Sequence, residues 1–226
     1  MLIKCKIKNL FFTILLIISF GFLESKTQLV FFIDELPLID KVIYIDPGHG
    51  GIDPGAVYKD LLEDEINLKI SIQLKYALES KGAIVYLTRS GDYDLASPDS
   101  TYRKQSDLLN RSILINESNC DLFISIHLNS VTSSTWSGAQ VFYDAINESN
   151  KYLAESIQES LKNDISTTRE ASLLENMYML KNTTTLGVLV EVGFLSNEND
   201  RYLLTQDDYH IKVSNSITNG IIDYFY

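Results

Sequence analysis

Short apolar, β-branched segments alternate along this chain with longer segments of helical periodicity. Residues 42–45 read Val-Ile-Tyr-Ile, and residues 60–80 carry apolar side chains every three or four positions. This alternation predicts an α/β fold: a single domain with a mostly parallel, twisted sheet flanked by helices. Further strands are predicted at 84–88, 122–127, 138–143, 177–180 and 188–192, and further helices at 102–116, 148–163, 198–205 and 207–224.

The N-terminal segment differs from the rest of the chain. Three lysines precede an apolar run over residues 10–23, a pattern typical of a signal peptide or membrane anchor. The run is shorter than the roughly 20 residues of a comfortable membrane span, and a buried core helix is the alternative interpretation. No small-x-small cleavage site is evident, so the sequence leaves cleavage open. The expected division is a signal or anchor at 1–23, a connecting segment at 24–40 and one folded domain at 41–226.

Charge and cysteine content exclude some functions. The chain of 226 residues has a net charge of -11 and no cluster of basic residues, which argues against nucleic-acid binding. Three of its 19 basic residues lie in the N-terminal segment, so 16 face all 30 acidic ones in the remainder, a net charge of -14. Cys120 is the only cysteine after residue 23, so we expect no internal disulfide and interpret Cys120 as a small apolar core residue.

Two of the three histidines follow predicted strands. His49 lies in Asp-Pro-Gly-His-Gly-Gly at 46–51, and His127 follows the strand at 122–126. Because ligands gather at the carboxyl ends of parallel strands, both residues are candidates for a functional site. Neutral imidazole is the commonest metal ligand, although a single histidine of this kind is more often a hydrogen-bonded structural residue.

A carboxylate could complete such a site. Glu63 continues the apolar stripe of Ile66 and Ile70, which directs it toward the sheet. The alternative is a capping box with Asp60, in which Glu63 would only satisfy a backbone N–H. Periodicity alone leaves both interpretations open.

Glu191 is a second unusual carboxylate, because it stands in the apolar segment Leu-Val-Glu-Val-Gly-Phe. A buried carboxylate is costly without a partner. One explanation is a salt bridge to Arg89, Arg111 or Arg169. The other is a general base whose pKa is raised toward neutrality by burial.

These side chains together suit metal-assisted hydrolysis. Two imidazoles and a carboxylate are a common catalytic zinc shell, with a fourth position for water. The sequence has no Gly-x-Ser-x-Gly elbow, no P-loop and no Gly-x-Gly-x-x-Gly after a strand that would favour another chemistry.

Several ordered motifs give the chain a family resemblance. Residues 42–51, Val-Ile-Tyr-Ile-Asp-Pro-Gly-His-Gly-Gly, resemble the opening motif of zinc-dependent N-acetylmuramoyl-L-alanine amidases. Residues 63–68 are similar to the family's Glu-x-x-x-Asn-Leu. Further similarities are Leu-Thr-Arg at 87–89, Arg-x-x-x-x-Asn at 111–116, Ser-Ile-His-x-Asn within 121–129 and Val-Glu-x-Gly-Phe-Leu-Ser-Asn within 189–197.

The resemblance implies roles for four residues. His49, Glu63 and His127 would be the zinc ligands, and Glu191 the catalytic acid/base. The implied reaction is hydrolysis of the amide between the lactyl group of muramic acid and L-alanine of the peptidoglycan stem peptide. Two alternatives are a zinc carboxypeptidase-like peptidase, which would need a fixed cation for a terminal carboxylate, and a non-catalytic wall-binding protein.

The short domain behind an N-terminal hydrophobic segment resembles the germination-specific, CwlD-like branch of the family. That likeness implies a role in spore cortex maturation, where muramic δ-lactam forms. Peptidoglycan is then the expected partner, and the chain is expected to be secreted or membrane-anchored on the cortex side of the forespore and mother-cell membranes. Because an acidic body is not attracted to an anionic wall, we also expect an accessory protein. Trp136 or Tyr143 could contact that protein or a sugar.

Overall fold

The first predicted strand forms β1 (Val42–Pro47), which lies inside a six-stranded sheet. β1 pairs in parallel with β4 (Ile84–Leu87) on one side and with β5 (Leu122–Asn129) on the other. The strand order is β4-β1-β5-β8-β6-β7, with β8 at Gly187–Phe194, β6 at Gln140–Tyr143 and β7 at Ser172–Leu173. All pairs are parallel except β6 with β8. The predicted mostly parallel sheet is therefore confirmed.

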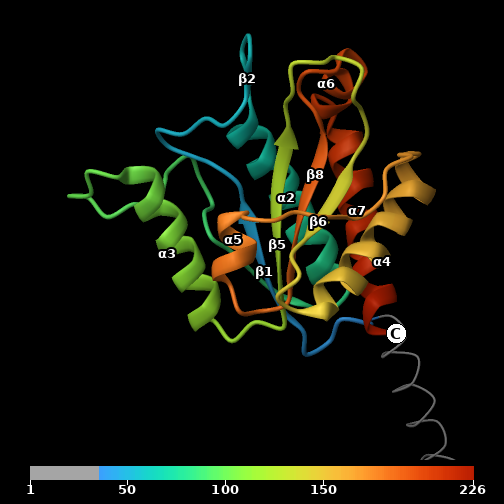
Figure 1. Cartoon of the computed structure of the whole chain (residues 1–226). Coiled ribbons are helices and arrows are strands. Elements are labelled where there is room, and N and C mark those ends of the chain that lie inside the picture. Colours follow the sequence, from blue (N-terminus) through green and yellow to red (C-terminus); the bar gives the residue numbers. More distant parts are fainter. Residues whose placement is uncertain (1–35) are drawn as a thin grey trace, which may run out of the picture.

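The computed structural model describes residues 36–226, and helices cover both faces of the sheet (Figure 1). One face packs against α2 (Glu63–Ser80), α4 (Glu148–Ile165) and α7 (Asp207–Phe225). The other packs against α3 (Arg103–Glu117) and the short α5 (Tyr178–Asn182). A last helix, α6 (Glu198–Leu204), follows β8, and a small hairpin of β2 (Val57–Tyr58) and β3 (Leu61–Leu62) precedes α2.

Two apolar clusters hold these layers together. The larger lies beneath α2, α4 and α7, and includes Ile70 and Ile217, which are fully buried. The smaller joins Phe123 and Leu189 of the sheet to α3 and α5, and Cys120 is buried within it as predicted. Each fully buried side chain of this size contributes about 1.5–3 kcal/mol, so these clusters fix the positions of the strand ends above them.

Three details differ from the sequence predictions. The segment at 177–180 was predicted as a strand, which is wrong: residues 178–182 form α5. A four-residue apolar run has no period that separates a buried strand from a helical turn, and here Met179 and Leu180 bury themselves in the smaller cluster. Helix α2 begins at Glu63 rather than at residue 60, because residues 57–62 form the hairpin. The short strands β2, β3 and β7 were not predicted.

The predicted signal or anchor at 1–23 lies outside the described residues, as does most of the connecting segment at 24–40. Within residues 36–226, none of the helices combines the length and apolar character required to cross a membrane.

Candidate metal centre

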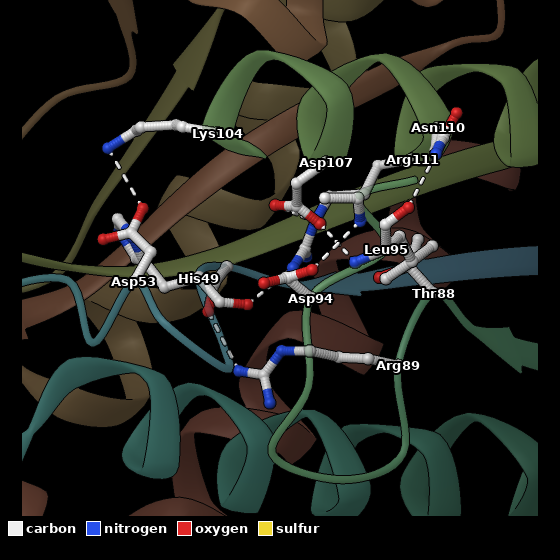
Figure 2. Close-up of polar contacts among 12 residues, drawn as sticks. His49, Asp53, Thr88, Arg89, Asp94, Leu95, Lys104, Asp107, Asn110 and Arg111 are labelled. Atoms are coloured by element: carbon white, nitrogen blue, oxygen red, sulfur yellow. Dashed lines mark hydrogen bonds and ion pairs between the residues drawn. The ribbon is translucent and has the colours of Figure 1, made fainter. Parts of the chain in front are cut away.

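His49 stands just beyond β1, in a loop that two buried arginines, Arg111 of α3 and Arg89, hold through its carbonyl groups (Figure 2). Arg111 donates to the carbonyl oxygens of Pro47 at 2.8 Å and of His49 at 2.5 Å. Arg89 donates to the carbonyl oxygens of Pro47 at 3.0 Å and of Gly48 at 2.9 Å. His49 has φ of 63°, a left-handed conformation that costs a non-glycine residue about 1 kcal/mol or more. The arginine contacts keep the loop in this conformation.

A buried polar network anchors Arg111 in turn. Asp46 of β1 accepts hydrogen bonds from Arg111 at 2.8 Å, Thr88 at 2.7 Å and Ser125 at 2.9 Å. Although burial opposes ionisation, Arg111 and the Thr88 hydroxyl lower the pKa of Asp46. Asp46 and Arg111 use their hydrogen-bonding groups within the fold. Both residues therefore support the loop and are not available to a substrate.

His127 lies near the end of the neighbouring strand β5, and its ring faces that of His49. The two ring centroids are 4.9 Å apart, at an interplanar angle of 79°. Gly48 makes this approach possible, because a Cβ at position 48 would lie 2.2 Å from Cε1 of His127. The two histidines predicted as a pair therefore lie on the same side of the molecule.

Glu63, the first residue of α2, places its carboxylate between the two imidazoles. Its Oε1 lies 3.2 Å from Nε2 of His49 and 3.1 Å from Nδ1 of His127. The backbone N–H of Leu128 donates to Oε1 at 3.1 Å, and that of Ala56 donates to Oε2 at 2.8 Å. These donors come from elsewhere in the fold, and α2 has Leu62 as its N-cap without a side-chain cap. The capping-box alternative for Glu63 is therefore wrong.

The three side chains form a group that can hold a metal ion. One ligand atom from each of His49, Glu63 and His127 lies within 4.8 Å of the others. Tetrahedral zinc with bonds of about 2.0–2.2 Å separates its ligand atoms by roughly 3.3 Å, close to the distances found here. The set of two imidazoles and one carboxylate also matches a catalytic zinc shell in its chemistry.

Asp53 supports this group from behind, a role that the sequence analysis did not identify. Its Oδ2 lies 3.1 Å from Nδ1 of His49, on the far side of the ring from Glu63, and 3.0 Å from Nζ of Lys104. A carboxylate on the second ring nitrogen fixes the tautomer and orientation of a metal-binding histidine. The available sequence signal was an aspartate four residues after His49 in the same glycine-rich loop.

The charges within the group stabilise one another. Burial opposes ionisation of Glu63, but hydrogen bonds and charge interactions with His127 and His49 hold its pKa far below the usual range. Burial likewise opposes protonation of His49, yet Glu63 and then Asp53 raise its pKa. The site thus keeps an ionised carboxylate at neutral pH, which a cationic ligand requires.

Glu191 lies on β8 beside the group without belonging to it. Its Cα is the register partner of His127, so both side chains project from the same face of the sheet. Its Oε2 is buried and has no hydrogen-bond partner among the described residues. Burial above all raises the pKa of Glu191 to about 7, with a smaller contribution from the Glu63 charge.

The salt-bridge alternative for Glu191 is wrong for residues 36–226. Arg89 and Arg111 donate to the loop around His49 and to Asp46, and Arg169 donates to Ser137 and Gln140. A buried carboxylate that titrates near neutrality beside a candidate metal group is suited to accept and return a proton.

A cleft of about 250 Å³ lies beside the candidate metal group on the α3 and α5 side of the sheet. His49 and His127 line it, together with Lys104 of α3 and Tyr178 of α5. A substrate can therefore reach the candidate metal group from solvent on this side.

Comparison with known proteins identifies the family of this chain. Residues 43–223 match the family described as N-acetylmuramoyl-L-alanine amidase. The chain belongs to this family. It is 45% identical over 196 residues to the germination-specific N-acetylmuramoyl-L-alanine amidase of Bacillus subtilis, covering 84% of this chain and 82% of that protein. It is 33% identical over 191 residues to the amidase LytC of the same organism, covering 84% of this chain and 36% of that larger protein.

Solved structures show the same likeness. The CwlD amidase from Clostridioides difficile, determined in complex with the GerS lipoprotein, superposes with a TM-score of 0.79 at 40% identity. That comparison covers 82% of this chain and 98% of CwlD. The prediction of an amidase of this family, similar to its CwlD-like members, is therefore confirmed. The individual roles of His49, Glu63, His127 and Glu191 stay predictions.

Proposed function

We propose that this chain is a zinc-dependent amidase that hydrolyses the bond between the lactyl group of muramic acid and L-alanine of the stem peptide. One observation carries the proposal: His49, Glu63 and His127 converge within 4.8 Å beside Glu191, whose buried Oε2 has no hydrogen-bond partner within residues 36–226. Family membership supports the substrate class. In this assignment the three converging residues are the zinc ligands and Glu191 is the catalytic acid/base.

The positions of these residues assign each of them a role in the reaction. When bound, zinc supplies a Lewis acid that polarises the scissile carbonyl and lowers the pKa of an attacking water. Glu191 accepts the proton of that water and returns it to the leaving nitrogen of L-alanine. Asp53 holds the ring of His49, and Arg111 holds its backbone carbonyl, so this ligand is fixed before substrate binds.

The biological setting is proposed from the relatives. The Bacillus subtilis relative is named as germination-specific, and we place this chain in spore cortex maturation, where stem-peptide removal precedes muramic δ-lactam formation. Residues 1–23 would export it or anchor it on the cortex side of the forespore and mother-cell membranes, with the catalytic domain at 41–226.

An accessory protein is the second partner in this proposal, alongside peptidoglycan. The Clostridioides difficile relative is in complex with a lipoprotein. The net charge of -14 after residue 23 gives this chain no electrostatic attraction to an anionic wall, so targeting would depend on such a partner.

Digestion of defined substrates tests the proposal. The zinc-loaded protein is incubated with purified peptidoglycan and, separately, with an unmodified peptide, and the products are identified by mass spectrometry. We expect free stem peptides that begin with L-alanine from peptidoglycan and no cleavage of the plain peptide. Glu191→Gln should lower the rate by about 10²- to 10⁴-fold, while Glu155→Gln, an exposed carboxylate on α4, should not. Cleavage of the plain peptide from its C-terminus would instead indicate the carboxypeptidase-like alternative.

A further inference from the structure

A second hollow, of about 460 Å³, lies on the opposite side of Glu191 from the candidate metal centre. Trp136, Gln140 and Arg169 line it, together with the segment that leads into β7. The Cα of Gln140 on β6 is the register partner of Glu191, just as Glu191 is the partner of His127. Adjacent strands are about 4.8 Å apart, so the hollow begins one strand beyond Glu191 and two beyond His127.

The guanidinium of Arg169 is held rigidly within this hollow. Its Nε donates to the carbonyl oxygen of Ser137 at 2.8 Å, and its Nη1 donates to Oε1 of Gln140 at 2.7 Å. The planar cation also stacks against two rings, 4.5 Å from the centroid of Phe194 and 5.0 Å from that of Trp136. Because these contacts use neutral groups, they fix the side chain without neutralising its charge.

Nearby carboxylates are engaged elsewhere. Within residues 36–226 Arg169 forms no ion pair, although acidic residues outnumber basic ones in this chain. The adjacent Glu170 pairs with Lys162 at 2.5 Å. Asp200 accepts the backbone N–H groups of Gly138 at 2.9 Å and Phe194 at 2.8 Å. A fixed cation in a polar hollow is therefore available to an anionic ligand.

The position of Glu191 indicates which part of a substrate reaches this hollow. If Glu191 returns a proton to the leaving nitrogen, the peptide that departs lies on the Glu191 side of the scissile bond. In the same direction across the sheet, the next strand is β6, which borders the hollow. An extended peptide advances about 3.3–3.6 Å per residue, so the first one or two residues after L-alanine span the distance of about 4.8 Å from β8 to β6.

We propose that Arg169, framed by Trp136 and Gln140, binds a carboxylate of the stem peptide on the leaving side of the scissile amide. The proposal rests on the function proposed above. Guanidinium and carboxylate form charge-assisted hydrogen bonds, and Nη2 of Arg169 has no partner among the described residues. The site thus selects acidic peptides over neutral ones.

Direct binding tests the proposal independently of catalysis. Trp136 is the only tryptophan of the chain, so its fluorescence reports on this hollow. The probes are the tripeptide L-alanyl-γ-D-glutamyl-L-lysine with free carboxylates and the same peptide with both carboxyl groups amidated. The full chain should bind the acidic peptide about 10- to 100-fold more tightly than the amide. Arg169→Gln should abolish that preference, whereas Lys151→Gln, a loss of the same charge on exposed α4, should retain it.

Kinetics with the matching N-acetylmuramoyl tripeptides gives the second readout. Arg169→Gln should lower kcat/KM for the acidic substrate about 10- to 100-fold and leave the amidated substrate within about twofold. An equal loss on both substrates would assign Arg169 a structural role, and an unchanged acidic preference in the binding titration would also overturn the proposal. If the wild-type protein cleaves neither substrate, the amidase function fails, and the fluorescence titration still decides on Arg169.

Discussion

Replacing Glu191 with glutamine should stabilise the metal-free protein at alkaline pH, although it removes the proposed catalytic group. Burial raises the pKa of Glu191 from 4.5 to about 7, so the folded state binds its proton more tightly than the unfolded state does. The stability that this proton confers is complete below pH 4.5 and is lost as the pH rises through 7. Over this range wild type therefore loses the stability that this proton confers, a loss that Glu191→Gln does not share.

The magnitude follows from the two pKa values. With about 1.36 kcal/mol per pH unit, the stability lost relative to low pH through the titration of Glu191 is about 1 kcal/mol at pH 5 and about 3 kcal/mol at pH 8. The amide of glutamine adds a burial penalty that does not depend on pH. The difference in stability between Glu191→Gln and wild type should therefore become more favourable to the variant by about 2.5 kcal/mol between pH 5 and pH 8.

Urea unfolding at the two pH values measures this change. Both proteins are treated with chelator, and Glu155→Gln on the exposed face of α4 serves as the control, with an expected change of less than about 0.5 kcal/mol. A stability difference between Glu191→Gln and wild type that is the same at pH 5 and pH 8 would refute the reasoning, because it would mean that Glu191 is not a buried group with a raised pKa.

Three further predictions concern the ligand group. Asp53→Asn removes the carboxylate behind His49 and should weaken zinc binding about 10- to 100-fold in a competition titration with a chelating dye; unchanged affinity would exclude an orienting role. Gly48→Ala places a Cβ 2.2 Å from the ring of His127, so zinc affinity should fall and the melting temperature should drop by several degrees in calorimetry; a variant with wild-type affinity would contradict the packing. Added zinc should raise the melting temperature of Glu63→Gln less than that of wild type, and an equal rise in both proteins would exclude Glu63 as a ligand.

The sequence was sufficient for the five longer strands of the sheet and for the two histidines, because both depend on local patterns. Strand-like segments predicted β1 and β5, and the carboxyl-end rule predicted that His49 and His127 would meet. Glu63 could not be decided in this way, since its apolar stripe agreed with both a ligand and a helix cap. Its actual partners, the N–H groups of Ala56 and Leu128, come from chain segments whose approach only the tertiary fold determines.

The contacts of Asp53 and Arg169 and the helix α5 could not be predicted from sequence patterns for similar reasons. Asp53 acquires its contact with His49 because the loop turns back on itself through residues in left-handed conformations. The sequence analysis considered Arg169 as a salt-bridge partner of Glu191. In the structure its guanidinium stacks instead against the rings of Trp136 and Phe194. The helix α5 was missed because its few apolar residues carry no periodicity.

X-ray absorption at the zinc edge of the zinc-loaded protein tests the central claim most directly. If His49, Glu63 and His127 bind one zinc ion, the spectrum shows one zinc per chain with nitrogen and oxygen neighbours at about 2.0–2.2 Å, imidazole scattering from two rings, and one ring fewer in His127→Ala. A sulfur neighbour, a shell without imidazole, or a spectrum that His127→Ala leaves unchanged would contradict it.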